Sequence, residues 1–197
     1  MSKLDAAYKL FDEYNRKDPR VFEWAGETYP QEYFFAIKLY EWVLKLNPDA
    51  GEELLLASRS QHIGRWEMPR DSYLEGRDSY LKWRKELALH HASIATRLMQ
   101  QVGYADVQVK RVSEILLKKR IKTDADVQTM ENALCLVFLE FQYEEFRKKH
   151  EDDLPKVVNI LWKSLLKMDA HGHQFALSLP YSEAGLNAVI AAMQKLN

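Results

Sequence analysis

Apolar side chains recur every three or four residues along most of the chain, the period expected when one face of a helix is buried. Only 7 glycines and 6 prolines interrupt this pattern, and no segment shows sustained strand-type alternation bounded by turns. The pattern predicts eight helices, at residues 2–17, 30–46, 51–63, 72–102, 104–120, 123–147, 154–170 and 182–195. Because no repeat, low-complexity tract or linker separates them, we expect an all-α protein with residues 1–197 in one domain.

The composition supports a globular protein of a reducing compartment. Apolar residues make up 47% of the 197 residues, enough for a core without metal or disulfide support. Cys135 is the only cysteine, which excludes an internal disulfide framework. The N-terminal stretch is polar, and apolar runs such as "ALCLVFLEF" are too short to cross a bilayer. We therefore expect a cytoplasmic protein without a membrane partner.

Charge is balanced overall but unevenly distributed. The formal net charge is −1, so the chain has no general attraction for nucleic acid or membranes. Basic residues nevertheless outnumber acidic ones between Arg59 and Lys85, and again in "KRVSEILLKKRIK" from Lys110 to Lys122. Two local basic clusters on a neutral protein favour a small anionic ligand over a long polyanion.

Several polar side chains fall on faces that the helical pattern assigns to the core. They belong to at least three predicted helices and are Gln61, His62, His91, Lys119, Gln128 and Glu131. Taken singly, each has an ordinary explanation, because buried histidines find hydrogen-bond partners and a terminal lysine extends to solvent. Since unpaired buried polar groups are costly, their coincidence predicts that they line a shared pocket.

The stretch around Gln61 and His62 carries a family resemblance. "LLLASRSQHIGRW" resembles the helix of the HD-domain phosphohydrolase superfamily in which a His-Asp doublet precedes Ile-Gly-Lys or Ile-Gly-Arg. "HASIATRLMQQVG", from His91, resembles that superfamily's next histidine segment, and "VSEILLKK" and "ENALCLVFLE" resemble its following motifs. The resemblance covers about residues 30–140 and implies an HD-like helical core.

The whole chain also resembles an uncharacterised family related to the HD proteins, through "QHIGRWEMPR", "YLKWR" and "KTDADVQT". Some members of that family carry the label glutamyl-tRNA synthetase. A synthetase needs a nucleotide-binding α/β domain, and the sequence shows no motif of one, so we set this activity aside.

Departures from the HD pattern decide what the resemblance implies for metal binding. Phe35 stands near the position of the first histidine, Gln61 and His62 occupy the doublet, and Leu134 stands where the last aspartate is expected. Only His91 keeps the expected residue type. The usual two-metal centre is therefore not expected, and we predict no cofactor. A single divalent metal on His62, His91 and a carboxylate such as Glu67 or Glu131 is the alternative.

Cationic side chains are the expected replacement for metal. His62 or His91 would act as the general acid or base, and Gln61 would orient a water or the ligand. The predicted ligand-binding residues are Arg65, Trp66, Arg70, Tyr80, Arg84 and Lys119. Arginine forks bind phosphate at two points, and aromatic rings stack on a nucleobase. The alternative is an amphipathic surface segment whose arginines pair with acids such as Asp71, Asp78 and Glu86.

The sequence thus predicts a divergent HD-like protein that binds a small anionic, nucleotide-like metabolite and that hydrolyses a phosphoester if it is an enzyme. Three alternatives stay open. The protein is a non-catalytic sensor that kept the pocket, an RNA-associated protein with salt-sensitive affinity, or a metal-dependent hydrolase with rebuilt ligands.

Overall fold

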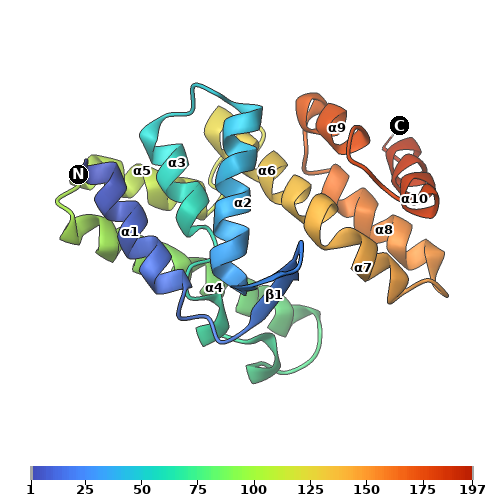
Figure 1. The fold of residues 1–197 in the computed structure, drawn as a ribbon, viewed down its shortest axis with the longest axis horizontal. Coiled ribbons are helices and arrows are strands. Elements are labelled where there is room, and N and C mark those ends of the chain that lie inside the picture. Colours follow the sequence, from blue (N-terminus) through green and yellow to red (C-terminus); the bar gives the residue numbers. More distant parts are fainter. Residues whose placement is uncertain (1, 197) are drawn as a thin grey trace. The chain divides into compact units, whose positions relative to one another are not determined.

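The computed structural model describes residues 2–196, which form ten α-helices, two short 3-10 helices and one two-stranded sheet (Figure 1). The all-α prediction is confirmed. The described residues divide into two compact units. Unit 1 consists of residues up to 44 and residues 49–119, and unit 2 consists of residues 45–48 and those from 120 on.

Unit 1 has α3 at its centre, packed against α1, α4 and α5. Its elements in chain order are α1 (Lys3–Asn15), β1 (Val21–Trp24), β2 (Glu27–Pro30), α2 (Gln31–Leu46, of which the last two residues count with unit 2), α3 (Glu52–Ser60), the 3-10 helices Arg65–Glu67 and Arg70–Ser72, α4 (Arg77–Gln101) and α5 (Asp106–Leu116). Apolar side chains at helical spacing, such as Leu54 and Ala57 of α3 and Val112 of α5, are fully buried.

Unit 2 is a second helical cluster with its own core. It contains α6 (Ala125–Phe141), α7 (Tyr143–Lys148), α8 (Leu154–Leu165), α9 (Ala170–Leu177) and α10 (Glu183–Gln194). Helix α8 packs on α10, and α6 packs on both α7 and α9. Tyr143 is fully buried, and its hydroxyl donates to the carbonyl oxygen of Gly185 at 2.9 Å.

A β-hairpin at residues 21–30 is an element that the sequence pattern did not predict. Its strands are antiparallel and pair Val21 with Pro30, and its two turn residues, Ala25 and Gly26, both have positive φ. That conformation matches the twist of a two-residue hairpin. The Phe22 ring packs on Phe34 of α2 at a centroid distance of 4.7 Å, so a tertiary contact holds the short strands in place.

Three of the predicted helices depart most from the structure, and α3 and α5 also end earlier than predicted. The predicted helix at 72–102 starts only at Arg77, because Gly76 adopts φ +107. The helix at 123–147 is broken at Gln142, whose φ of −127 and ψ of −23 depart from helical values. The helix at 154–170 ends at Leu165, and α9 follows as a separate helix after Asp169. The side chain of Asp169 accepts a hydrogen bond from the Gly172 amide and thereby caps that helix.

Among the described residues, none of the helices is both long and apolar enough to cross a membrane.

Candidate functional site

The turn after α3 carries the polar residues of the HD-like stretch. Helix α3 ends at Ser60, three residues earlier than predicted, and Gly64 reverses the chain with φ +72. A Cβ at Gly64 would meet the Ile94 side chain and would lie 3.2 Å from Nε2 of His90, so both the backbone and the space require glycine. Gln61 and His62 therefore project from a turn and not from the face of a helix.

His91, in the middle of α4, fixes this turn. Its Nδ1 atom lies 2.6 Å from the carbonyl oxygen of Ile63, and its ring is almost completely buried. Gln61 is also buried, and its side-chain amide donates to the Leu116 carbonyl oxygen of α5 at 3.4 Å. The rings of His62 and His91 lie 5.7 Å apart between centroids. We call Gln61, His62 and His91 the histidine cluster.

A buried carboxylate joins the histidine cluster to two arginines. One oxygen of Glu32 accepts a hydrogen bond from Arg20 at 2.7 Å and lies 3.8 Å from Nε of Arg65. The other oxygen lies 4.0 Å from Nδ1 of His62. Asp18 completes the network. Its carboxylate accepts hydrogen bonds from the Arg20 guanidinium and from the backbone N–H of Glu32 at the start of α2.

Burial and neighbouring charge lower the pKa of both imidazoles of the cluster. Burial is the main cause that lowers the pKa of His91 to about 4, although the bond to Ile63 opposes it. The His62 side chain is 34% exposed, yet burial of its ring and then the charge of Arg65 hold its pKa well below the usual value. Burial raises the pKa of Glu32, while Arg65 and Arg20 lower it in part.

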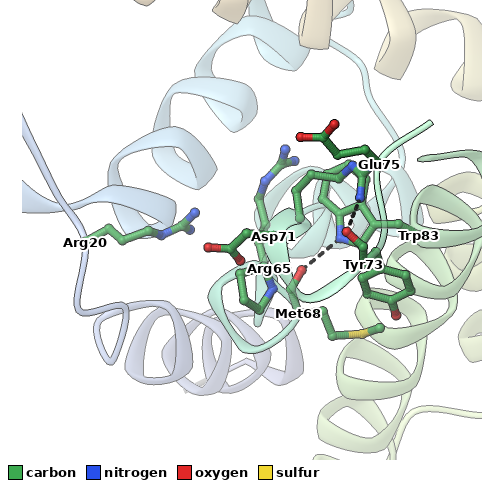
Figure 2. A pocket seen from close by; sticks show the side chains of 9 residues that line it. Arg20, Arg65, Met68, Asp71, Tyr73, Glu75 and Trp83 are labelled. Atoms are coloured by element: carbon green, nitrogen blue, oxygen red, sulfur yellow. Dashed lines mark hydrogen bonds between the residues drawn. The ribbon is translucent and has the colours of Figure 1, made fainter. Parts of the chain in front are cut away.

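A pocket of about 580 Å³ opens beside this network (Figure 2). We call it the arginine pocket, and it is lined by Arg20, Arg65, Met68, Pro69, Arg70, Asp71, Tyr73, Glu75 and Trp83. In Figure 2, Arg20 and Trp83 approach from opposite sides, with Arg65 and Asp71 between them in this view. The Trp83 indole donates to the Met68 carbonyl oxygen at 2.9 Å, which holds the loop against α4.

The predicted ligand residues separate into two groups. Arg65 and Arg70 line the arginine pocket, and the guanidinium of Arg70 also donates to the carbonyl oxygens of Tyr73 and Leu74, each at 3.0 Å. Tyr80 and Arg84 are exposed on α4 and do not line the pocket, although the Tyr80 ring lies 5.9 Å from the charged carbon of each of Arg70 and Arg84.

Trp66 and Lys119 also lie outside the pocket lining. The Trp66 ring packs against Tyr14 at 5.9 Å. Lys119 was expected to continue the apolar stripe of its helix, but α5 ends at Leu116 and Lys118 turns the chain with φ +54. Lys119 is therefore exposed. The neighbouring Lys118 is the lysine whose positive charge helps to lower the pKa of His62.

The polar residues of α6 serve the packing of unit 2. Gln128 donates to the Lys167 carbonyl oxygen and to Asn132, each at 3.0 Å, and Asn132 donates to Asp169 at 2.8 Å. Glu131 is buried 3.8 Å from Nζ of Lys167. Gln128 therefore bonds to the connection between α8 and α9, and the carboxylate of Glu131 lies near Lys167 of the same connection.

The side chains at the turn do not fit the single-metal site that was the alternative suggested by the HD resemblance. Both oxygens of Glu67 are engaged, one by the Tyr14 hydroxyl and the other by Nε2 of His90, each at 2.7 Å. Nδ1 of His91 is turned to a carbonyl oxygen. Within residues 2–196, no three His, Cys, Asp or Glu side chains are grouped as a metal ion requires.

Asp18, Arg20 and Glu32 are residues of the network that the sequence did not predict. Glu32 lies in the first turn of a helix, where an acid is common, so its position carries no signal of a site. Asp18 and Arg20 precede a hairpin that the pattern did not reveal. Only the tertiary structure joins these three residues to Arg65.

Comparison with known proteins identifies a family. The family model described as Domain of unknown function (DUF4202) matches residues 5–189. The chain belongs to this family. Membership of DUF4202 confirms the predicted relation to an uncharacterised family, and the description of DUF4202 names no activity. No curated protein matches the chain, and no solved structure matches it.

Proposed function

We propose that this protein binds a small phosphorylated, nucleotide-like metabolite in the arginine pocket of unit 1. The observation that carries the proposal is the gathering of three guanidinium groups, from Arg20, Arg65 and Arg70, on one pocket of about 580 Å³. Guanidinium forks match phosphate oxygens at two points, and pockets of this size accommodate small metabolites.

The three arginines differ in how far other residues neutralise them. Arg20 is engaged by Asp18 and Glu32, and Arg65 lies near Glu32. Arg70 makes hydrogen bonds only to carbonyl oxygens and forms no ion pair among the described residues. Arg70 therefore offers the least compensated positive charge to an anion, and Arg65 is the second donor.

The remaining lining favours a nucleotide or sugar phosphate over a bare polyanion. Asp71 and Glu75 supply hydrogen-bond acceptors for hydroxyl or amino groups, and Tyr73 and Trp83 supply aromatic surface. Two acids in the lining would repel an RNA backbone, which argues against the RNA alternative.

Descent from the HD superfamily is part of the proposal. The resemblance of "LLLASRSQHIGRW" and the segment from His91 supports it, because these segments form α3, its turn and α4, whose side chains meet at the histidine cluster. A shared fold does not carry an activity, so the ligand is argued from the pocket alone.

Calorimetry and thermal shift test the binding. We expect AMP, ribose 5-phosphate or inorganic phosphate to raise the melting temperature of the full chain, by an amount that follows the ratio of ligand concentration to Kd. Arg70→Ala should weaken this binding at least about tenfold, the effect of losing one charge-assisted contact. Arg77→Ala is the matched control, since Arg77 is exposed on α4 outside the pocket lining. Equal losses in both variants, or no response to any phosphate compound, would refute the proposal.

Phosphoester hydrolysis is a second candidate, favoured by the 4.0 Å approach of the Glu32 carboxylate to His62 beside Arg65. A neutral His62 would accept the proton of a water whose oxygen attacks phosphorus; as the P–O ester bond breaks, the resulting imidazolium would return that proton to the leaving oxygen. Phosphate release from p-nitrophenyl phosphate or AMP, abolished by His62→Gln but kept by His150→Gln, would support it. A ligand that binds and stays unchanged would support the sensor alternative.

A further inference from the structure

Two atoms of the histidine cluster are buried without a hydrogen-bond partner. They are Nε2 of His91 and Oε1 of Gln61, and the residues that carry them are 3% and 4% exposed. Buried polar atoms without a partner are rare in folded proteins, because each one forfeits its hydration. Their presence beside a candidate ligand pocket calls for an explanation in terms of what binds there.

The local hydrogen bonds fix the chemical character of both atoms. The Ile63 carbonyl oxygen can only accept, so Nδ1 of His91 carries the proton of the neutral ring and Nε2 presents a lone pair. The Leu116 carbonyl oxygen likewise fixes the orientation of the Gln61 amide, whose NH₂ group donates to it. Oε1 of Gln61 therefore faces away from this bond as an acceptor. Both atoms need a donor.

The chemistry of the surroundings limits which donor this is. The lone pairs of Nε2 of His91 and Oε1 of Gln61 repel an anion, so the phosphate group itself does not bind at these atoms. A metal ion would need further ligands, but Glu67 of the turn is bound on both oxygens by Tyr14 and His90, and the described residues contain no group of three His, Cys, Asp or Glu side chains. A neutral O–H or N–H group satisfies the acceptors without either difficulty.

A chain of close neighbours connects the cluster to the arginine pocket. The His91 ring lies 5.7 Å from that of His62, which approaches Glu32 at 4.0 Å. Glu32 in turn approaches Arg65, which lines the pocket, at 3.8 Å. Arg65 and His62 are both partly exposed, whereas Glu32 and His91 are buried, so the chain of neighbours runs from the pocket lining to the buried acceptors.

We propose that Gln61 and His91 form a donor-selective subsite that takes a neutral hydroxyl or amino group, supplied by the bound metabolite or by a water held beside it. This subsite rests on the proposed function, in which the arginine pocket binds the phosphate group of the metabolite. It adds a second point of recognition, at which hydrogen-bond acceptors of the protein bind another group of the same ligand. Phosphorylated compounds with a hydroxyl or amino group should then bind more tightly than phosphate alone.

A pair of substitutions at His91 separates this role from a structural one. In His91→Asn, the side-chain NH₂ group replaces Nδ1 and can still donate to Ile63, but no atom reaches the Nε2 position. In His91→Gln, the amide oxygen reaches the Nε2 position, but the bond to Ile63 is lost. If His91 is purely structural, His91→Asn should preserve both stability and ligand affinity better than His91→Gln. If Nε2 binds the ligand, His91→Gln should have the higher ligand affinity.

The measurement is the Kd of the full chain and both variants for AMP and for inorganic phosphate, by calorimetry. We expect His91→Asn to weaken AMP binding about tenfold or more and to leave phosphate within about twofold, because one hydrogen bond to AMP is lost. His91→Gln should keep AMP affinity within about threefold of the unsubstituted chain, despite a lower melting temperature. These results support the subsite with the metabolite as the donor.

A crystal structure of the unsubstituted chain, with and without AMP, identifies the other source. If both variants bind AMP equally, a water within about 2.7–3.2 Å of Nε2 still supports the subsite, with water as the donor. No donor at that position in either crystal, or a metal ion there, overturns it. If neither phosphate nor AMP binds, the proposed function fails, and the water at Nε2 alone then decides for or against the subsite.

Discussion

Nδ1 of His91 lies 2.6 Å from the carbonyl oxygen of Ile63, and this contact ties the middle of α4 to the turn that follows α3. The same turn carries His62 and Arg65, so the bond positions the histidine cluster relative to the arginine pocket. The orientation of one buried imidazole therefore matters both for the stability of unit 1 and for its candidate site.

The tautomer of His91 is the most direct consequence. We expect nitrogen-15 NMR of histidine-labelled protein to show a protonated Nδ1 and an unprotonated Nε2 at pH 7, since only Nδ1 faces a carbonyl oxygen. The spectrum of His91→Asn identifies the resonance. An Nε2–H tautomer would contradict the assigned hydrogen bond.

Stability should fall as the pH drops from about 6.5 toward 4. The folded state lowers the pKa of His91 from 6.5 to about 4, so the unfolded chain binds more protons in this window. The contribution of His91 is fully present above pH 6.5 and amounts to about 3 kcal/mol, lost progressively until pH 4. His62 shifts in the same direction, whereas the raised pKa of Glu32 acts in the opposite one.

Urea denaturation at several pH values from 7.5 to 4 checks this dependence. His91→Asn should flatten the slope between pH 6.5 and 4, and His150→Asn should leave it unchanged. An identical slope in all three proteins would show that His91 does not cause the effect.

Gly64→Ala should be strongly destabilising. The substitution combines a backbone at φ +72 with a Cβ pressed against Ile94, so we expect a loss of about 2–4 kcal/mol. Gly103→Ala is the matched control, because Gly103 has φ +85 but nothing within 4 Å of an added Cβ. The control should lose only the backbone term, about 1–2 kcal/mol. Chemical denaturation of both variants separates the two causes.

Ala25→Gly should stabilise the hairpin. Ala25 has φ +53 in the two-residue turn between β1 and β2, a conformation that costs an L-residue about 1–2 kcal/mol. Relief of this strain exceeds the entropy cost of glycine, so the free energy of unfolding should rise by about 0.5–1 kcal/mol. Ala25→Val, which restricts the backbone further, should shift the melting temperature the other way. A stabilised valine variant would refute the turn geometry.

Glu32→Gln should cost more than an equivalent change at the surface. Glu32 is buried and its carboxylate accepts a hydrogen bond from Arg20, but both arginines are more than a third exposed and Asp18 still pairs with Arg20, so we expect a loss of about 1–2 kcal/mol. Glu41→Gln removes a carboxylate that pairs with Lys38 at the surface of the same helix and should cost below about 0.5 kcal/mol. Equal losses in thermal denaturation would mean that the network around Glu32 is not a buried one.

The fold class followed from the sequence because helical periodicity is a local property. Apolar spacing located the long helices. The predicted boundaries were wrong where the conformation depends on single residues or on distant partners. The break at Gln142 has no local signal, and it precedes Tyr143, whose hydroxyl bonds to Gly185 in another helix. The hairpin escaped notice because four-residue strands carry little periodicity, and Phe22 secures them by packing on α2.

The candidate site divides in the same way. The sequence by itself determined that Gln61, His62 and His91 are polar groups in apolar surroundings and that Arg65 and Arg70 follow them, because residue type and spacing are written in the chain. Only the tertiary structure decided that Glu32 lies between Arg20 and Arg65 and that Lys119 faces solvent. It also decided that Gln128 donates a hydrogen bond to the Lys167 carbonyl oxygen in unit 2. The physical reason is that a side chain's partner depends on how distant segments pack, and local patterns do not encode that packing.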